Sequence, residues 1–384
     1  MPGAPAPRAS RARGGFGGGL RGRILRLAAS ERFQAFAARM PLLARKTRRE
    51  GEEIFDLIAG FAKSQVLFGL VEAGVLERLT DGPATSAALL PGYPERSAEL
   101  LLSGGVALGL LRRQSDSFSL TLRGAALLGV PGLQDMIRHH SVMYGDLADP
   151  LALLRRETSP ELARFWPYVF GAAAAEDPDT ARRYSHLMTE TQRLVAQDTL
   201  AQAELGQARE VLDVGGGTGA FLAALGAQYK GPKLHLFDLP SVAPGAASRF
   251  REAGLSDRAQ ITPGSFRDDP LPTGADTISL IRVLYDHSDE TVRALLAKVY
   301  AALPSGGRLV ISEPMLGGEA PTVAGDIYFA LYTFCMETGR ARAQAQIAEM
   351  VRAAGFEAVE TPRARRPFVT SLVLARKPAG QIFV

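Results

Sequence analysis

The glycine-rich segment Val211–Phe221, which reads VLDVGGGTGAF, constrains the fold of this chain more than any other stretch. Apolar residues lead into three consecutive glycines, and a new apolar run follows them. This order is typical of a strand, a tight turn and the start of a helix, where a backbone without Cβ atoms can approach a ligand. Taken alone, the spacing of Gly215, Gly217 and Ala220 also fits a dinucleotide-binding fold, or glycines that only shape a loop.

Three features near this segment favour a different nucleotide cofactor. Asp213 lies two residues before the first glycine, where it would repel a pyrophosphate but could pair with a cationic amino-acid group. Asp238 ends a second apolar strand about 20 residues further on, where an acid can accept hydrogen bonds from both ribose hydroxyls. A third apolar strand, Asp276–Val283, precedes the polar segment YDHSDE. This order resembles the S-adenosylmethionine-dependent methyltransferases, and Asp213 argues against a dehydrogenase.

The carboxyl-terminal half alternates strand and helix patterns, which indicates a mostly parallel sheet. No helix pattern separates the last two strands, so we expect them to close the sheet as an antiparallel pair. Helices are expected at Gly219–Ala227, Glu290–Ala302 and Ala343–Ala354. The expected strands are Glu210–Val214, Lys233–Asp238, Gln260–Pro263, Thr277–Arg282, Arg308–Glu313, Glu357–Thr361 and Ser371–Arg376.

Length and composition are those of a soluble globular protein of two or three domains. The chain has 384 residues, of which 46% are hydrophobic and 22% charged. Its one cysteine, Cys335, excludes an internal disulfide framework and fits a reducing compartment. The segment Met1–Leu20 lacks the apolar core of a signal peptide, and no apolar run is long enough to span a bilayer. We therefore expect a cytoplasmic protein.

The amino-terminal region is basic. Residues 1 to 23 combine arginines with many glycines, which is typical of a disordered tail, and the alternative is an electrostatic contact with anionic lipid headgroups. The following segment, Arg26–Arg49, mixes apolar and basic residues as an amphipathic helix does. Such a helix can lie on the inner or photosynthetic membrane as a peripheral contact, or pack on a partner subunit.

A winged-helix-like pattern follows the basic region. Helical spacing in Glu52–Leu79 is interrupted at Gly74, and a helix at Glu95–Leu111 precedes a short alternating segment, Asp116–Leu122. Winged helices often bind DNA. The candidate recognition helix is mostly apolar, however, so we expect it to be buried, and we expect no nucleic-acid partner.

The middle of the chain contains two adjacent histidines, His139 and His140, in a predicted helix. Neighbouring residues point to different faces of a helix, so we assign no metal site to them. One of them facing a substrate is an alternative to a core or surface position. An aromatic cluster, Trp166–Phe170, then precedes one or two long helices in Ala174–Leu205.

An ordered set of motifs carries a family resemblance: DVGGGTGA, FDLP, GSFRDDPLP, RVLYDHSDE, SEP and AAGF. With these motifs, residues 55 to 377 resemble the plant-and-bacterial small-molecule O-methyltransferases. The resemblance implies a helical, winged-helix-like dimerisation domain before a Rossmann-like class I methyltransferase domain, a homodimer, and S-adenosyl-L-methionine as cofactor. We accordingly expect a basic tail and amphipathic helix over residues 1–45, a dimerisation and substrate domain over 46–195, and a cofactor-binding domain over 196–384.

A narrower resemblance rests on GFAKSQVLFGLVEAG, RHHSVMYGDLADP, FWPY and RVLYDH. These segments are similar to the carotenoid hydroxyl O-methyltransferases of purple phototrophic bacteria. That group methylates the tertiary C1 hydroxyl of acyclic carotenoids, of the hydroxyneurosporene or demethylspheroidene type, in the spheroidene pathway. The resemblance implies an apolar carotenoid substrate. The alternatives are a methyltransferase acting on a phenolic or bacteriochlorophyll-type molecule, and a winged-helix regulator that senses a ligand without turnover.

The family resemblance also implies the cofactor contacts. Glycines equivalent to Gly215 and Gly217 cradle the methionine part of the cofactor, and an acid equivalent to Asp238 binds the ribose. A large apolar residue packs on adenine, and here it is Phe266. Ser265 stands where the family has a carboxylate, so we expect a weaker contact with adenine, through water. The remaining residues that we assign to the cofactor site are Asp213, Leu239 and Arg282.

The catalytic position departs from the family pattern. The family has His-Asp-Trp with the histidine as general base, whereas this chain has Tyr285-Asp286-His287. Glu313 matches a glutamate that orients the base, and a second family glutamate is replaced by Ala341. A tertiary alcohol is too weakly acidic to be ionised near neutral pH, so orientation becomes the main contribution. We predict that Tyr285 either orients the hydroxyl or only lines the site, and that the proton leaves to water, Glu313 or His287.

Overall fold

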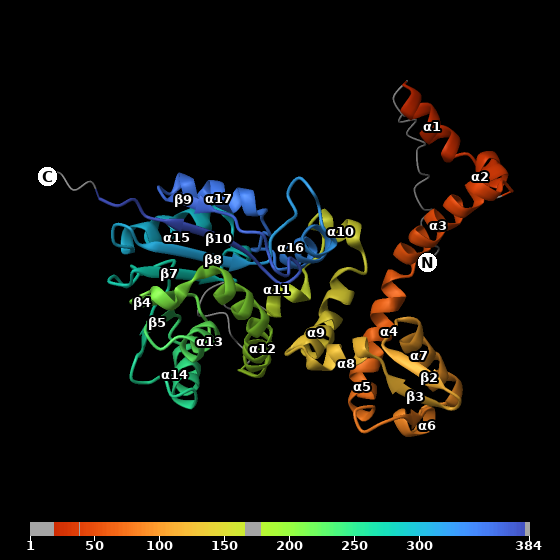
Figure 1. The fold of residues 1–384 in the computed structure, drawn as a ribbon, viewed down its shortest axis with the longest axis horizontal. Helices are drawn as coiled ribbons and strands as arrows, with labels where there is room; N and C mark the ends of the chain where they lie inside the picture. Colours follow the sequence, from red (N-terminus) through yellow and green to blue (C-terminus); the bar gives the residue numbers. More distant parts are fainter. Residues whose placement is uncertain (1–18, 38, 166–177, 381–384) are drawn as a thin grey trace, which may run out of the picture.

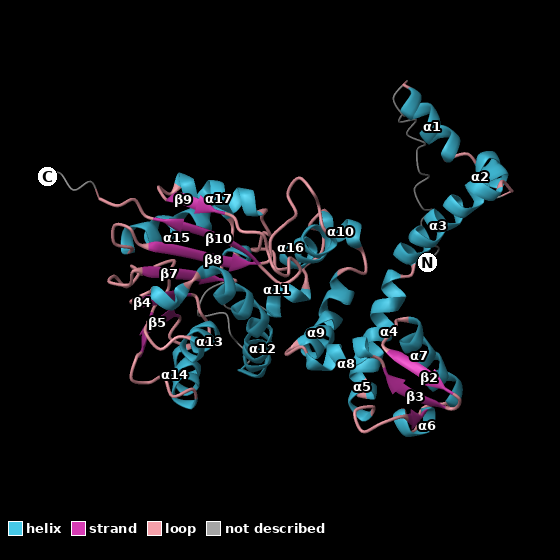
Figure 2. Cartoon of the chain, in the orientation of Figure 1, coloured by secondary structure: helices cyan, strands magenta, loops and turns pink. Residues whose placement is uncertain are grey.

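The computed structural model describes residues 19–37, 39–165 and 178–380, and the Trp166–Phe170 cluster lies outside them. In the described part, a helical arm leads into a small α/β unit, and connecting helices lead on to a large sheet flanked by helices (Figure 1). Figure 2 shows that strands occur in the small unit and in the large sheet, with helices between. The candidate site therefore has to be sought where the connecting helices meet the large sheet.

The arm consists of three helices, α1 (Leu20–Ala28), α2 (Glu31–Ala37) and α3 (Pro41–Ile58), and it extends away from the rest of the chain (Figure 1). The prediction of one amphipathic helix over Arg26–Arg49 is therefore wrong. Ser30 Oγ accepts a hydrogen bond from the Phe33 backbone N–H at 3.3 Å, which starts α2. A proline, favoured in the first helical turn, starts α3.

The small unit confirms the predicted arrangement of helices and a hairpin. Gly74 has a φ of +65° and separates two helices, as its place in the sequence predicted. Helix α7 packs closely on α4, since a Cβ on Gly104 would lie 2.8 Å from Val66 Cγ1. Its elements are α4 (Gly60–Glu72), α5 (Val75–Arg78), β1 (Ala84–Thr85), α6 (Ser86–Leu89), α7 (Glu95–Ala107), β2 (Leu111–Gln114), β3 (Ser117–Leu120) and α8 (Leu122–Gly129), with the three strands in the order β1-β3-β2.

In the described residues between the small unit and the large sheet lie the helices α9 (Leu133–Asp146), α10 (Pro150–Leu154), α11 (Glu161–Phe165) and α12 (Pro178–Ala203) (Figure 1). Helix α12 packs on α13 (Ala220–Gln228) and on strand β8 (Arg308–Glu313). Helix α9 contacts α4, α11, α12 and α16 (Ala330–Cys335), so it joins the small unit to the large one.

The large sheet has seven strands in the order β6-β5-β4-β7-β8-β10-β9. Strand β10 runs antiparallel to both β8 and β9, and the other neighbours are parallel. The predicted antiparallel pair is thus confirmed. From β4 the chain runs outward through β5 and β6, and it then returns to β7 on the other side of β4. Ligands bind at the carboxyl ends of strands where the strand order reverses in this way. The strands are β4 (Glu210–Val214), β5 (Lys233–Asp238), β6 (Ala259–Pro263), β7 (Thr277–Ile281), β8 (Arg308–Glu313), β9 (Glu357–Glu360) and β10 (Ser371–Arg376).

Alternating residues of the strands bury apolar side chains on both faces of the sheet. In β4, for example, Leu212 and Val214 belong to one core cluster and Val211 to the other. Helices α15 and α17 cover the first face, and α12, α13 and α14 cover the second. The helices not yet given are η2 (Leu205–Gln207), α14 (Ala243–Glu252), η3 (Leu284–Asp286), α15 (Asp289–Ala302), the π-helix η4 (Val323–Phe329) and α17 (Gln344–Ala353).

Within the described residues, no single helix is both long and apolar enough to cross a bilayer. Only a pair of segments, Ala44–Ile58 and Gly60–Glu72, reaches that length and composition, with a bend of 54° between them.

Candidate active site

The glycine loop lies at the carboxyl end of β4. Gly215 and Gly217 have φ values of +71° and +61°, which strongly favour glycine over other residues. A Cβ on Gly215 would lie 3.0 Å from Val283 Cγ2, so this position is also sterically restricted. No described atom lies within 4 Å of a Cβ placed on Gly217. The backbone at Gly217 therefore faces open space that a ligand can approach.

Asp238 ties the end of β5 to this loop. One carboxylate oxygen accepts the Gly217 backbone N–H at 2.6 Å, and the other accepts the Leu239 backbone N–H at 2.7 Å. Burial raises the pKa of Asp238, and these two bonds oppose the rise. Each carboxylate oxygen has a second lone pair, so the group can still accept hydrogen bonds from a pair of ribose hydroxyls. The predicted residues Gly217, Asp238 and Leu239 are thus together.

Asp213 is placed differently from the prediction. Its side chain is fully buried beneath the loop, where Oδ1 accepts a hydrogen bond from Ser279 Oγ at 2.6 Å. A Cβ on Gly216 would lie 2.2 Å from Asp213 Oδ2, so the carboxyl fills the space under that glycine. Burial raises the pKa of Asp213 to about 7. In this structure the residue supports the loop from below and is not exposed to a cofactor.

Ser265 also differs from its predicted role. Its hydroxyl donates to Asp268 Oδ2 at 2.8 Å, and its backbone N–H donates to Asp269 Oδ2 at 2.8 Å. Lys298 Nζ holds the same turn through the backbone carbonyl oxygens of residues 266, 267 and 269. The Ser265 hydroxyl thus contacts a nearby carboxylate, that of Asp268, which we did not select from the sequence.

Phe266 and His287 lie next to each other. Their rings are in an edge-to-face arrangement with centroids 5.2 Å apart, and Phe266 lies within 4 Å of the Gly215 Cβ position. His287 Nδ1 accepts a hydrogen bond from Arg267 at 3.1 Å. Burial, together with the charge of Arg267, lowers the pKa of His287 to about 3. His287 therefore packs beside the predicted adenine-binding residue and is a poor proton acceptor.

Glu313, at the end of β8, holds the loop that follows β7. One of its carboxylate oxygens accepts the backbone N–H groups of Leu284 and Tyr285, at 2.9 and 3.2 Å. The side chain is fully buried, which raises the pKa of Glu313 to about 7. The predicted closeness to Tyr285 is present, but the contact is with its backbone. Ala341, which replaces the second family glutamate, is buried.

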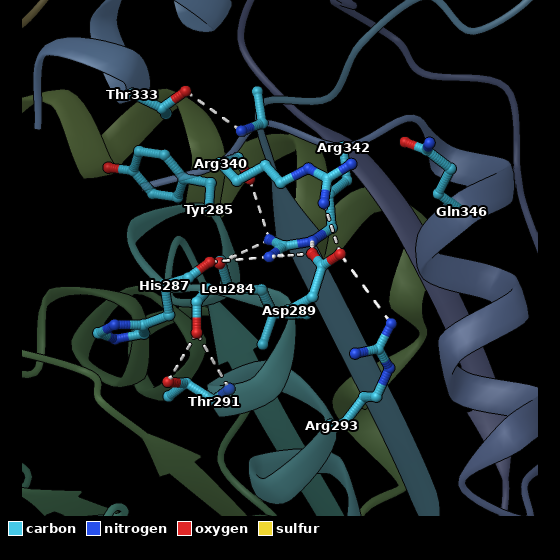
Figure 3. A network of polar contacts seen from close by, with 12 residues as sticks. Leu284, Tyr285, His287, Asp289, Thr291, Arg293, Thr333, Arg340, Arg342 and Gln346 are labelled. Atoms are coloured by element: carbon cyan, nitrogen blue, oxygen red, sulfur yellow. Dashed lines mark hydrogen bonds and ion pairs between the residues drawn. The ribbon is translucent and has the colours of Figure 1, made fainter. Parts of the chain in front are cut away.

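Arg342 holds the other side of the same loop, and we did not select it from the sequence. Its guanidinium donates to the carbonyl oxygens of Leu284 and His287, at 2.9 and 2.8 Å, and forms an ion pair with Asp289 (Figure 3). Only 2% of the residue is exposed. Asp289 also binds Arg340, whose backbone N–H donates to the Tyr285 carbonyl at 2.8 Å. The sequence around Arg342, RARAQ, has no pattern that predicts a buried arginine. Its contacts with the loop could therefore be found only in the structure.

Tyr285 is the central side chain on the side of the site away from the glycine loop. It is 2% exposed, and its hydroxyl accepts a hydrogen bond from Arg282 at 3.3 Å. Burial strongly raises the pKa of Tyr285, so its hydroxyl stays protonated. Arg282 has a φ of +59°, unusual for a residue with a side chain, and also donates to Thr191 Oγ1 at 2.9 Å. Arg282, predicted to bind the cofactor, thus contacts Tyr285 and Thr191 in this structure.

Among the described residues, no group of three or more His, Cys, Asp or Glu side chains is placed to hold a metal ion.

Comparison with known proteins decides the family. The O-methyltransferase domain family matches residues 144–357. The chain is also 55% identical, over 372 residues, to the demethylspheroidene O-methyltransferase of Cereibacter sphaeroides, covering 96% of this chain and 97% of that protein. This chain belongs to the O-methyltransferase family. The demethylspheroidene O-methyltransferase of Rhodobacter capsulatus is 50% identical, over 92% of this chain and 88% of that protein.

Solved structures agree with this family. The human N-acetylserotonin methyltransferase in complex with SAM has a TM-score of 0.73 and 25% identity, over 86% of this chain and 98% of that one. The predicted class I methyltransferase fold is therefore confirmed, and the protein is an S-adenosylmethionine-dependent O-methyltransferase. The residues present fit this cofactor, because the open backbone at Gly217, the Asp238 carboxylate and the Phe266 ring lie together at the switch point of the sheet.

Proposed function

We propose that this O-methyltransferase methylates the tertiary C1 hydroxyl of an acyclic carotenoid of the demethylspheroidene or hydroxyneurosporene type, in the spheroidene pathway. The observation that carries the proposal is 55% identity over nearly the full length of a demethylspheroidene O-methyltransferase. The second such relative, at 50% identity, supports the same substrate class. Tyr285 at the usual place of the histidine base is consistent with an alcohol substrate, which no side chain can ionise beforehand.

The site favours the reaction mainly by orienting the acceptor hydroxyl relative to the methyl group of the cofactor. When bound, S-adenosylmethionine supplies an electrophilic methyl group. The acceptor oxygen forms a bond to the methyl carbon while the bond between that carbon and sulfur breaks, and the hydroxyl proton leaves late. Tyr285, held by Arg282 at 3.3 Å, has a protonated hydroxyl that can hydrogen-bond the acceptor oxygen and direct its lone pair. Glu313 and Arg342 keep the Tyr285 backbone in place.

A transfer assay tests this function. Labelled S-adenosylmethionine is incubated with detergent-dispersed 1-hydroxy carotenoids, and in parallel with a phenol and a bacteriochlorophyll precursor. We expect label in the carotenoid alone. Label in the phenol or the pigment precursor instead would refute the proposed substrate. Cofactor binding without transfer to any acceptor would favour a ligand-sensing regulator.

We also propose that the enzyme is a homodimer. Large apolar side chains at the α3–α4 junction are exposed in the single chain, among them Phe55, Leu57 and Phe61 at 67%, 81% and 74%. Contiguous exposed apolar surface of this kind is typical of a subunit interface. Light scattering after gel filtration should give twice the chain mass of 41.0 kDa. A monomer at micromolar concentration would contradict this proposal.

We further propose that the enzyme is cytoplasmic and docks on the inner or photosynthetic membrane through the arm. Leu20, Ile24 and Leu27 follow the spacing of one helix face and are 77%, 57% and 53% exposed. The sequence from position 19 to 40 holds five arginines and a single acid, Glu31. Apolar residues beside such a charge excess match an anionic bilayer surface, where a carotenoid would be dissolved.

Liposome binding tests the arm. Replacing Arg21, Arg23 and Arg32 by glutamine should weaken binding to anionic vesicles about 100-fold at low salt, because each arginine near the surface contributes about 1 kcal/mol. The control replaces three exposed arginines elsewhere, Arg112, Arg251 and Arg352, and should bind normally. Equal binding by both variants would contradict membrane docking. Loss of the dimer in the arm variant would instead assign the arm to the partner subunit.

A further inference from the structure

Two adjacent histidines of α9 each bind a tyrosine of the segment that follows β8. His139 Nε2 lies 2.9 Å from Tyr332 Oη, and His140 Nε2 lies 2.7 Å from Tyr328 Oη. The two tyrosines are one helical turn apart, and their rings are stacked with centroids 6.0 Å apart. Both histidines thus reach the segment Val323–Cys335, each through a different tyrosine.

The two pairs share an apolar cluster but differ in burial. His139 and Tyr332 are buried, and Tyr332 belongs to this cluster with Met143, Leu162 and Met336. Tyr328 packs against the same cluster but is only partly buried, and the charge of Arg282 acts on it. Because Arg282 also binds the Tyr285 hydroxyl, the second pair continues a polar group that begins at the loop after β7.

Local backbone geometry marks the same place. Tyr328 lies in η4, a π-helix, and such turns occur frequently at functional sites. Arg282 adopts a left-handed conformation with a φ of +59°, which costs free energy and persists where the surrounding structure holds it. Tyr328 and Arg282 are thus both carried by unusual backbone segments.

Two groups near the loop, Tyr285 and His287, are poor proton acceptors. Tyr285 stays protonated, and the low pKa of His287, about 3, makes its imidazole a weak base. Glu313 binds two backbone N–H groups through one carboxylate oxygen, and among the described residues its other oxygen has no partner, so Glu313 is the competing acceptor. His140 is half-buried, and its Nε2 lies 2.7 Å from the Tyr328 hydroxyl, so its imidazole is placed to take a proton from that hydroxyl.

We propose that Tyr328 binds the acceptor hydroxyl and passes its proton to His140. This inference rests on the proposed function and adds the proton route. As the oxygen bonds to the methyl carbon and the carbon–sulfur bond breaks, the oxygen's proton moves to Tyr328 Oη. Tyr328 gives its own proton to His140 Nε2, and the imidazolium later releases one to water. The route requires His140 to carry its resting proton on Nδ1. The titratable or charged groups that act on this pair are His139, Tyr144 and Arg282.

The two pairs provide matched variants. His140→Asn and Tyr328→Phe should each lower kcat about 100-fold, the usual contribution of a positioned proton acceptor, with little change in KM. The control variants His139→Asn and Tyr332→Phe remove the hydrogen bond of the neighbouring histidine–tyrosine pair. They should lower the free energy of unfolding more than they lower kcat. In the wild type, kcat should fall at acid pH as His140 becomes protonated, and this limb should disappear in His140→Asn.

A readout independent of turnover completes the test. Imidazole nitrogen NMR of the enzyme should show His140 protonated on Nδ1, and Tyr328→Phe should shift its titration while cofactor affinity, measured by calorimetry, stays unchanged. Carotenoid methylation with an unaltered acid limb in His140→Asn would overturn the inference while leaving the proposed function intact. An equal loss of kcat in the His139 and His140 variants would also overturn it. No transfer to carotenoid by the wild type would instead refute the proposed function.

Discussion

The cofactor side of the site and the acceptor side are built in different ways. Gly215, Gly217, Asp238 and Leu239 lie within 25 positions of one another, and the Asp238 carboxylate accepts the backbone N–H groups of Gly217 and Leu239. The acceptor side combines groups from α9, the loop after β7, the end of β8 and η4, and side chains make most of its contacts. Side-chain groups on separate elements can change independently, so the acceptor side can adopt a new substrate while the cofactor side is retained.

The largest effect should come from the arginine that clamps the acceptor loop. Arg342→Met should lower the free energy of unfolding by about 4 kcal/mol, because it leaves Asp289 and two loop carbonyl groups without this partner. Urea unfolding measures this change. The control Arg293→Met removes an exposed partner of Asp289, 4.0 Å away, and should cost less than about 1 kcal/mol. Equal losses in the free energy of unfolding for the two variants would mean that the burial of Arg342 adds nothing to stability.

A second test measures how the buried carboxyl of Glu313 makes the free energy of unfolding depend on pH. The pKa of Glu313 rises from 4.5 to about 7 on folding, so between these values the folded state binds more protons than the unfolded state. Its contribution to stability is therefore complete below pH 4.5 and is lost as pH rises toward 7, by roughly 3 kcal/mol. Glu313→Gln should be stabilised relative to wild type as pH rises through this range. The exposed Glu349→Gln control should keep the wild-type slope in urea unfolding.

On the cofactor side, Asp238→Ala should weaken binding of S-adenosylmethionine about 100-fold, since it removes an acceptor for ribose hydroxyls and two bonds that shape the loop. Isothermal titration calorimetry measures the affinity. The exposed Asp257→Ala control should bind as wild type does. Affinity retained in Asp238→Ala would show that the glycine loop alone binds the cofactor, and would remove the contrast between the two sides.

The smallest expected effect is that of the Tyr285 hydroxyl. Tyr285→Phe should lower kcat about tenfold, because it removes one hydrogen bond that orients the acceptor and keeps the ring. Steady-state kinetics with the carotenoid checks this, with Tyr300→Phe, which packs on Phe356 away from the loop, as control. A loss of about 10,000-fold in kcat would indicate that Tyr285 is the general base. An unchanged kcat would indicate that Tyr285 only lines the site.

Strand and helix positions in the large sheet were predictable because apolar alternation and turn residues report burial directly. Four strands, Glu210–Val214, Lys233–Asp238, Arg308–Glu313 and Ser371–Arg376, have the predicted bounds. The arm was predicted less well, since a short polar break at Ser30 and the proline that starts α3 divide a continuous amphipathic pattern. Amphipathic spacing shows a tendency to form helix, whereas capping side chains decide where each helix ends.

The cofactor side could be read from the order of residues along the chain, because the groups that build it are close in sequence and the glycines impose its backbone conformation. Gly217 and Asp238 could therefore be assigned from the motif pattern alone. The acceptor side, in contrast, depends on packing between distant elements. His140 and Tyr328 are 188 positions apart, and they meet because α9 packs against the segment after β8. Burial of Arg342 likewise follows from packing, and no local pattern records which distant groups a buried side chain will contact.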